Sequence, residues 1–94
     1  MVFRSSVPPF PTTVHFEEEY SDCHSIMEIV APDSIGLLYR IGREISGLRC
    51  NIELVLITTE GNKAVDVFYL THEGKKLSPQ MQAELSKRIT AAIG

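Results

Sequence analysis

The segment Ser25–Leu38, SIMEIVAPDSIGLL, contains the residues best suited to hold a small charged ligand. An apolar run ends at Pro32, and Asp33 and Gly36 follow. Asp33 can accept hydrogen bonds from free backbone N–H groups, so we expect it to cap a helix that begins near Ser34. A glycine costs about 1 kcal/mol relative to alanine inside a helix, so Gly36 calls for a physical reason. One reason is that a residue without a Cβ lets another group approach the backbone closely. First-turn N–H groups left open in this way can bind a carboxylate.

Other ionisable side chains give weaker candidate sites. Three acidic residues on three predicted strands could bind a metal, or act as acid and base, on the sheet face away from the helices: Glu28, Glu53 and Asp66. No further ligand stands at a matching spacing, so a hydrated or interfacial face explains them better. Three histidines near strand ends are more typical of scattered surface residues than of a ligand set: His15, His24 and His72. We therefore expect no catalytic residue, metal or cofactor.

Four strands and two helices are predicted to position the Asp33 turn. Runs of β-branched and aromatic residues predict strands at Thr12–Phe16, Ile26–Val30, Asn51–Thr59 and Ala64–Thr71. Apolar residues at three- and four-residue steps predict a helix of about four turns that ends near Gly47. A second helix is expected after Ser78 and Pro79, an N-cap and a first-turn proline.

This order of elements predicts a ferredoxin-like α+β sandwich. A parallel return after the first helix requires a right-handed crossover, which places both helices on one face of a four-stranded antiparallel sheet. The N-terminal strand Thr12–Phe16 is expected beside the strand around Ile26, replacing the strand usually found at the C-terminus. Residues 1–11, which hold three of the five prolines, are expected to form an extended tail or linker, and residues 12–94 the domain.

Charge and cysteine usage narrow the possible partners. A net charge of −3 and a pI near 5.5 argue against nucleic acid or anionic lipid, which require concentrated Lys and Arg. Phe68 and Tyr69 are similar to base-stacking pairs of RNA-binding sheets, but adjacent strand residues face opposite ways. Cys23 and Cys50 have no metal-binding spacing and there is no signal peptide or membrane segment, so we expect a cytoplasmic location and structural thiols.

A set of apolar residues is expected on the sheet face opposite the helices, where a monomer would leave them wet. The set comprises Ile26, Val30, Val55, Ile57, Phe68 and Leu70. Exposed apolar surface of this kind predicts a partner sheet.

Three segments resemble the ACT domain, a small ligand-sensing module of amino-acid metabolism. These are APDSIGLLYRI, CNIELVLITTEG and KAVDVFYLT, and the resemblance runs from about Thr12 to the end. Ser34 and Ile35 stand where the family often has Arg-Pro, so no arginine contact is carried over. The segment ITTEGNKAVDVFYLTHEGKKL resembles the C-terminal ACT domains of bifunctional uridylyltransferases, a resemblance that implies glutamine as the favoured ligand and control of nitrogen metabolism as the role.

The resemblance implies a non-catalytic regulatory domain that binds a small amino acid at a dimer or interdomain interface. It implies a homodimer or a pair with another ACT domain. The residues that it selects lie on the turn of one copy and on the following strand of its neighbour: Ala31, Asp33, Gly36, Leu37 and Asn51. Each could have a structural role alone, because Asp33 could only cap the helix, Gly36 only allow close packing and Asn51 only end a strand.

Two further functions stay open. One is a dimerisation or assembly module with a vestigial ligand site, supported by the missing Arg-Pro and the apolar sheet face. The other, more remote, is an acylphosphatase-like enzyme, since ferredoxin-like domains of this length include such enzymes. Asp33 argues against it, because a carboxylate beside a phosphate is repulsive.

Overall fold

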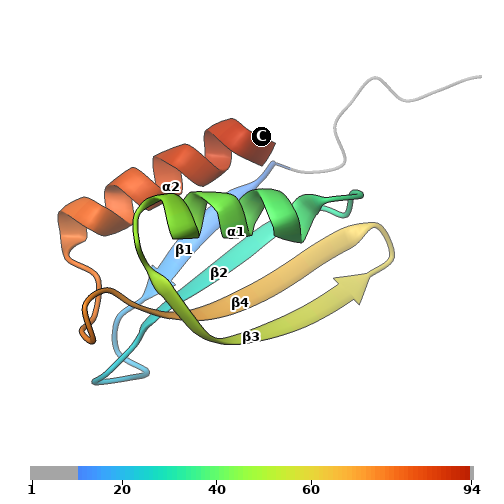
Figure 1. Ribbon diagram of the computed structural model, residues 1–94. Helices are drawn as coiled ribbons and strands as arrows, with labels where there is room; N and C mark the ends of the chain where they lie inside the picture. The colour runs from blue at the N-terminus through green and yellow to red at the C-terminus, as the bar shows by residue number, and fades with distance from the viewer. Residues whose placement is uncertain (1–10, 94) are drawn as a thin grey trace, which may run out of the picture.

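The structure, a computed structural model, describes residues 11–93, so most of the expected tail lies outside the described residues. The elements follow the predicted order (Figure 1): β1 Thr13–Glu17, β2 Ser25–Pro32, α1 Leu37–Gly47, β3 Asn51–Glu60, β4 Lys63–Thr71 and α2 Pro79–Ile93. Strand bounds agree with the predicted ones to within one or two residues.

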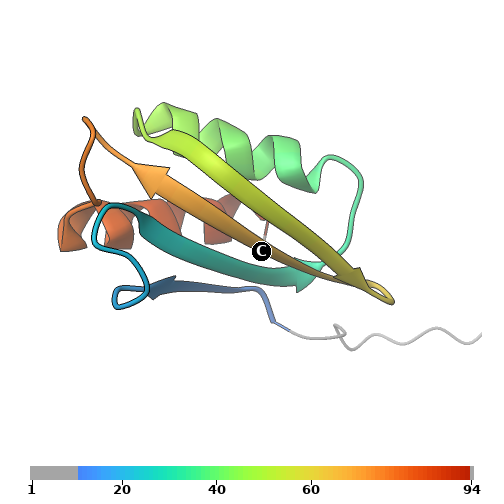
Figure 2. The ribbon, with the colours of Figure 1, turned by 90° about the horizontal axis from the view of Figure 1, so that it is seen from below.

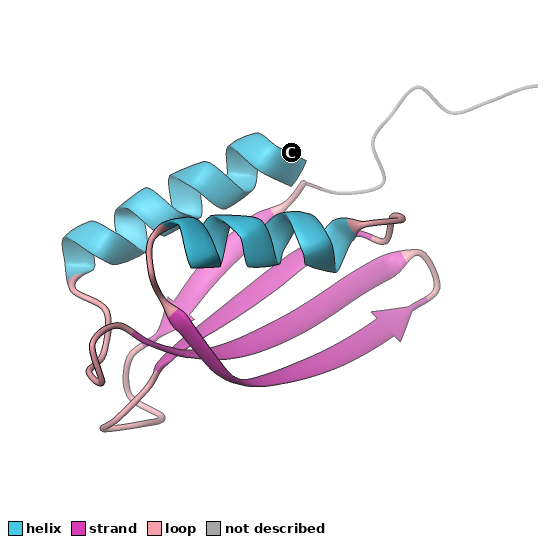
Figure 3. Cartoon of the chain, in the orientation of Figure 1, coloured by secondary structure: helices cyan, strands magenta, loops and turns pink. Residues whose placement is uncertain are grey.

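The four strands form one antiparallel sheet in the order β1-β2-β4-β3. Both helices cover the same face and leave the other open (Figures 1 and 3). The ferredoxin-like α+β prediction is therefore confirmed. β1 pairs with β2 at one edge of the sheet, with Thr13 opposite Val30. It stays a prediction that β1 replaces the last strand usual in the family.

The core lies between the helices and alternate residues of the two central strands. Cross-strand pairs on this face include Met27 with Phe68 and Ala31 with Ala64, all buried. The helices contribute Leu37, Ile41, Ile45, Leu85 and Ile89. Burying each large apolar side chain stabilises the fold by about 1.5–3 kcal/mol, which holds both helices on the sheet.

The predicted assignment of residues to sheet faces is right for Ile26 and Val30 of β2 but wrong for the residues named on β4 and for Val55 and Ile57 of β3. Asp66, Phe68 and Leu70 face the helices, because they pair with Ile29, Met27 and Ser25 of the covered face. Val55 and Ile57 lie on this face too, opposite Phe68 and Asp66. The open face instead carries Val65 and Val67 of β4 and Leu54 and Leu56 of β3, so it is as apolar as expected.

The two helices begin differently. In α2 the backbone N–H of Met81 donates to Ser78 Oγ at 3.2 Å, so the predicted cap is confirmed. In α1 the first helical residue is Leu37, not Ser34, and the N-cap is Gly36, with φ 79° and no side-chain hydrogen bond. Asp33 therefore does not cap the helix, because the left-handed glycine delays its start by three residues.

Strand β3 is left uncovered along its whole length. All ten of its residues are exposed, including Leu54, Leu56 and Ile57. Seen from below the sheet, the C-terminal end of α1 lies near the start of β3, and the two elements diverge towards the tip of the β3–β4 hairpin (Figure 2).

Candidate ligand-binding site

The turn between β2 and α1 is tied to the β3–β4 hairpin and to its own helix. The N–H of Asp33 donates to the carbonyl of Asn62 at 2.8 Å. The N–H of Leu37 donates to the carbonyl of Ser34 at 3.2 Å, and Arg40 Nη2 donates to Ser34 Oγ at 3.0 Å. These bonds give the turn one fixed shape, with Gly36 supplying the left-handed residue that it requires.

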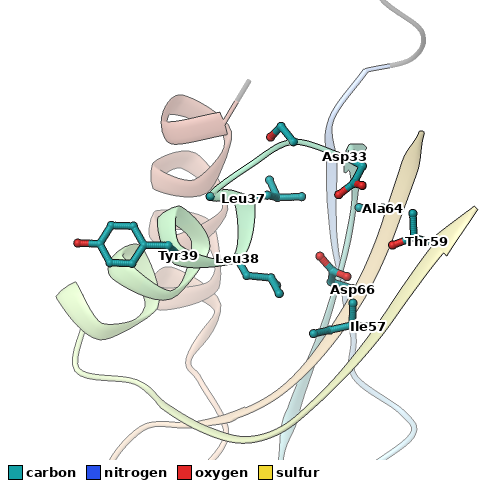
Figure 4. A pocket seen from close by; sticks show the side chains of 10 residues that line it. Asp33, Leu37, Leu38, Tyr39, Ile57, Thr59, Ala64 and Asp66 are labelled. Atoms are coloured by element: carbon teal, nitrogen blue, oxygen red, sulfur yellow. The ribbon is translucent and has the colours of Figure 1, made fainter. Parts of the chain in front are cut away.

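A pocket of about 190 Å³ lies between this turn and the hairpin end of the sheet (Figure 4). It is lined by Asp33, Ser34, Gly36, Leu37, Leu38, Tyr39, Ile57, Thr59, Ala64 and Asp66. Pockets for drug-sized ligands are about 300–1,000 Å³, so this one suits a smaller molecule.

The helical side of the pocket offers hydrogen-bond donors. The first helical bond of α1 runs from the N–H of Arg40 to the carbonyl of Gly36 at 3.0 Å. The N–H groups of Leu38 and Tyr39, two residues that line the pocket, have no backbone acceptor among residues 11–93. Free first-turn N–H groups at the positive end of a helix dipole can bind a carboxylate.

The strand side carries a buried carboxylate that the sequence analysis did not place here. Asp66 is 1% exposed, and its Oδ1 atom is buried without a partner among the described residues. Burial raises the pKa of Asp66, and the negative charge of Asp33 raises it further. The available signal was a charge between Val65 and Val67, inside an otherwise apolar strand.

Three of the five predicted site residues, Asp33, Gly36 and Leu37, line this pocket. Ala31 does not, since it is buried in the core opposite Ala64, which does line it. Asn51 is at the far end of β3 within the same chain, paired with Thr71. The role of each in binding stays a prediction.

The weaker candidates do not come together. Glu28 is exposed on the open face, Asp66 is buried on the other, and Glu53 Oε2 accepts a hydrogen bond from Thr71 Oγ1 at 2.9 Å. Within residues 11–93, no three His, Cys, Asp or Glu side chains form a group that could hold a metal ion. Phe68 is buried while Tyr69 lies on the open face, as expected for adjacent strand residues.

The cysteines are both free, with Cys23 exposed and Cys50 buried. Burial raises the pKa of the Cys50 thiol, which favours its protonated form. The structural role expected for both cysteines stays a prediction.

Comparison with known proteins decides the family. A family model described as "ACR9-like, ACT-like domain" matches residues 13–94. The chain belongs to the ACT-like domain family. An ACT-like domain is a regulatory module.

Relatives of this ACT-like domain include bifunctional uridylyltransferase/uridylyl-removing enzymes. The chain is 40% identical to the enzyme of Vibrio campbellii over 79 residues, 83% of this chain and 9% of the relative. It is 36% identical to that of Cereibacter sphaeroides over 86 residues and 32% identical to that of Nitrosococcus oceani over 81 residues, covering 89% and 85% of this chain. The chain thus spans about 9% of the length of these relatives. No solved structure matches the chain.

A second hollow of this ACT-like domain lies on the open face of the sheet. It measures about 430 Å³ and is lined by His15, Glu17, Tyr20, Ile26, Glu28, Val67 and Tyr69. Tyr20 is 80% exposed and Glu28 is also exposed, so these polar groups are already hydrated and do not require a ligand. The pocket beside α1 is therefore the better candidate.

Within residues 11–93, neither helix is long and apolar enough to span a bilayer.

Proposed function

We propose that this ACT-like domain is a sensor that binds a small amino acid, with glutamine favoured, in the pocket between α1 and the β3–β4 hairpin. The observation that carries the proposal is that the turn selected by the family motif lines a small pocket with free helix N–H groups in its wall. These groups suit the α-carboxylate that all amino acids share.

The relatives support a place for this sensor in a longer enzyme. They are named for adding and removing uridylyl groups, and this chain matches only a small part of them. We therefore place the domain in control of a uridylyltransferase-like activity, in nitrogen or amino-acid metabolism. The residues of that chemistry would belong to a different domain.

The exposed strand β3 supports pairing with a second copy or a second ACT domain. Its free backbone edge is flanked by apolar side chains on both sides, including Ile57, 54% exposed, and Leu56, 49% exposed. An uncovered apolar edge strand is a template for pairing with another strand. Antiparallel pairing centred on the middle of β3 would set Asn51 of a second copy near Glu60, at the hairpin end where the pocket lies. The ligand would then bind between two copies.

The test is calorimetric titration of the chain with L-glutamine and a panel of other amino acids, after light scattering has fixed its oligomeric state. We expect saturable binding by a dimer. Asp33→Ala should weaken the binding about tenfold, because a charged wall of the pocket is lost. Asp22→Ala, an exposed aspartate in the β1–β2 connection, is the matched control and should bind like the wild type.

A second function, an assembly module with a vestigial site, is supported by the same exposed β3 edge and by Ser34 and Ile35 in place of the family's Arg-Pro. A well-folded dimer that gives no heat with any amino acid would favour this module over the sensor.

A further inference from the structure

Asp66 occupies an unusual position for an acidic residue. Its backbone is in the central strand β4, between Ile29 of β2 and Ile57 of β3, and its side chain points to the helical face. Oδ1 is buried and no described group donates a hydrogen bond to it. A buried acceptor without a donor is unfavourable, so such an atom in a native fold calls for an explanation.

The unpartnered carboxylate faces the pocket and not a closed core. Asp66 lines the pocket together with Asp33, and the two carboxylates lie on its strand side, opposite Leu37 and Leu38 (Figure 4). Among the described residues that line the pocket there is no lysine, arginine or histidine. Arg40 bonds to Ser34 in the same wall, but neither acid forms an ion pair within residues 11–93, so a cationic group of a ligand can pair with them.

We propose that Asp66 is the receptor for the ammonium group of the bound molecule, so that the pocket selects ligands with a primary amine beside a carboxylate. This inference rests on the proposed function and deepens it by assigning the two charged ends of the ligand. The carboxylate binds the N–H groups of Leu38 and Tyr39, and the ammonium binds the strand side.

An ammonium fits this site better than a metal ion does. It has three N–H donors, and the strand side offers acceptors on Asp66, Asp33 and the hydroxyl of Thr59. Calcium takes about six to eight oxygen ligands, and magnesium keeps several waters and demands near-octahedral geometry. Within residues 11–93 no group of three His, Cys, Asp or Glu side chains could hold a metal ion.

The electrostatics favour the same occupant. The raised pKa of Asp66 records the unfavourable burial of its charge and the repulsion from Asp33. A cation placed between them relieves both effects, whereas a neutral donor relieves only the missing hydrogen bond and an anionic group relieves neither. A keto acid or a simple carboxylic acid would therefore leave Asp66 uncompensated.

The test compares three probes on the wild-type chain by calorimetry. L-Glutamine carries both charged groups, glutaramate lacks only the α-amino group, and γ-aminobutyramide lacks only the α-carboxylate. We expect glutaramate to bind about 10- to 100-fold more weakly than glutamine, the usual effect of losing a charged hydrogen bond. The carboxyl ¹³C resonance of Asp66 should shift with glutamine and with γ-aminobutyramide but not with glutaramate.

The variant Asp66→Asn should bind glutamine about 10- to 100-fold more weakly than the wild type does, and it should no longer prefer glutamine over glutaramate. Asp22→Asn makes the same change on the surface and should keep both. Thermal melting of each variant separates a lost contact from a lost fold, and the three probes test the wild type without any substitution.

The outcomes separate this inference from the function on which it rests. Equal binding of glutaramate and glutamine by the wild type would overturn the role of Asp66 and leave the amino-acid sensor standing. A shift of the Asp66 resonance by magnesium chloride and not by any amine would overturn it in favour of a metal ion. If the panel of amino acids gives no binding at all, the proposed function fails, and the assignment of Asp66 fails with it.

Discussion

The two edges of the sheet differ in length and in what covers them. β1 has five residues, and its Val14 and Phe16 pack against the core beneath the helices. β3 has ten residues, all exposed. Both strands are rich in strand-forming residues, so the difference lies in the placement of the helices and not in the strands. The candidate pocket lies beside β3, the edge strand that the helices leave uncovered.

The largest effect should come from a charge on the open edge. Leu56→Lys should weaken dimerisation about 100-fold or more, because a symmetric pair would contain the lysine twice on its apolar seam. Light scattering over a dilution series measures it. The matched change Thr13→Lys, on the β1 edge, should leave the oligomeric state unaltered. If Thr13→Lys dissociates the dimer and Leu56→Lys does not, β1 is the paired edge.

Truncation of the covered edge should act on stability instead. Phe16→Ala should lower the free energy of unfolding by about 2 kcal/mol, because the ring packs against the core but is only partly buried. Leu54→Ala, made in the monomeric Leu56→Lys chain, should change it by less than about 0.5 kcal/mol. Urea denaturation measures both. Equal losses at the two positions would mean that the edges are equally covered.

The third contrast is between Asp66, a buried carboxylate on β4 next to β3, and the exposed Asp33. Asp66→Asn should raise the stability of the ligand-free chain at pH 7 by about 1 kcal/mol, because the cost of burying a carboxylate is removed. Asp33→Asn, at an exposed position, should have a smaller effect.

The pH dependence of that gain has a definite sign. Burial raises the pKa of Asp66 in the folded chain above its ordinary value of 3.8. The stabilising effect of protonation is therefore fully present below pH 3.8 and is lost as the pH rises through the higher folded pKa. Melting temperatures of wild type and Asp66→Asn should diverge as the pH rises across this window. A gap that closes instead would contradict a raised pKa.

Effects of at most about 1 kcal/mol are also expected at Gly36 in the pocket wall and at Gly42 in the helix. Gly36→Ala should cost about 1 kcal/mol, because φ is 79° while a Cβ there would meet nothing within 4 Å. Gly42→Ala is the matched control, with equally open space but inside α1, and should stabilise the chain by up to about 1 kcal/mol. A loss at both positions would indicate crowding and not backbone conformation. Thermal melts distinguish these outcomes.

Sequence patterns predicted most of the fold because local spacing determines strands and helices. They did not determine which face of β4 is covered, because Val65 and Val67 on one side are as apolar as Phe68 and Leu70 on the other. In β3 an irregularity between Ile52 and Leu54 shifts the alternation by one residue, and no local signal announces it.

The candidate site was predicted in part. The family motif led to Asp33, Gly36 and Leu37, which the fold brings to one pocket. Asp66 was missed, because an acidic residue in a strand is expected on a hydrated face. The start of α1 was predicted three residues early, because aspartate is a residue type that often caps helices. The left-handed conformation of Gly36, which sets the actual start, depends on the turn as a whole.

The unequal edges also limit how far this domain can assemble. An edge strand that pairs with its own copy is used up by that contact, and the remaining edge, β1, is short and packed beneath the helical layer. The five-residue β1 edge offers only a short strand for a further contact, so association would favour a closed pair through β3. The same strand that permits dimerisation would then not support polymerisation into fibres.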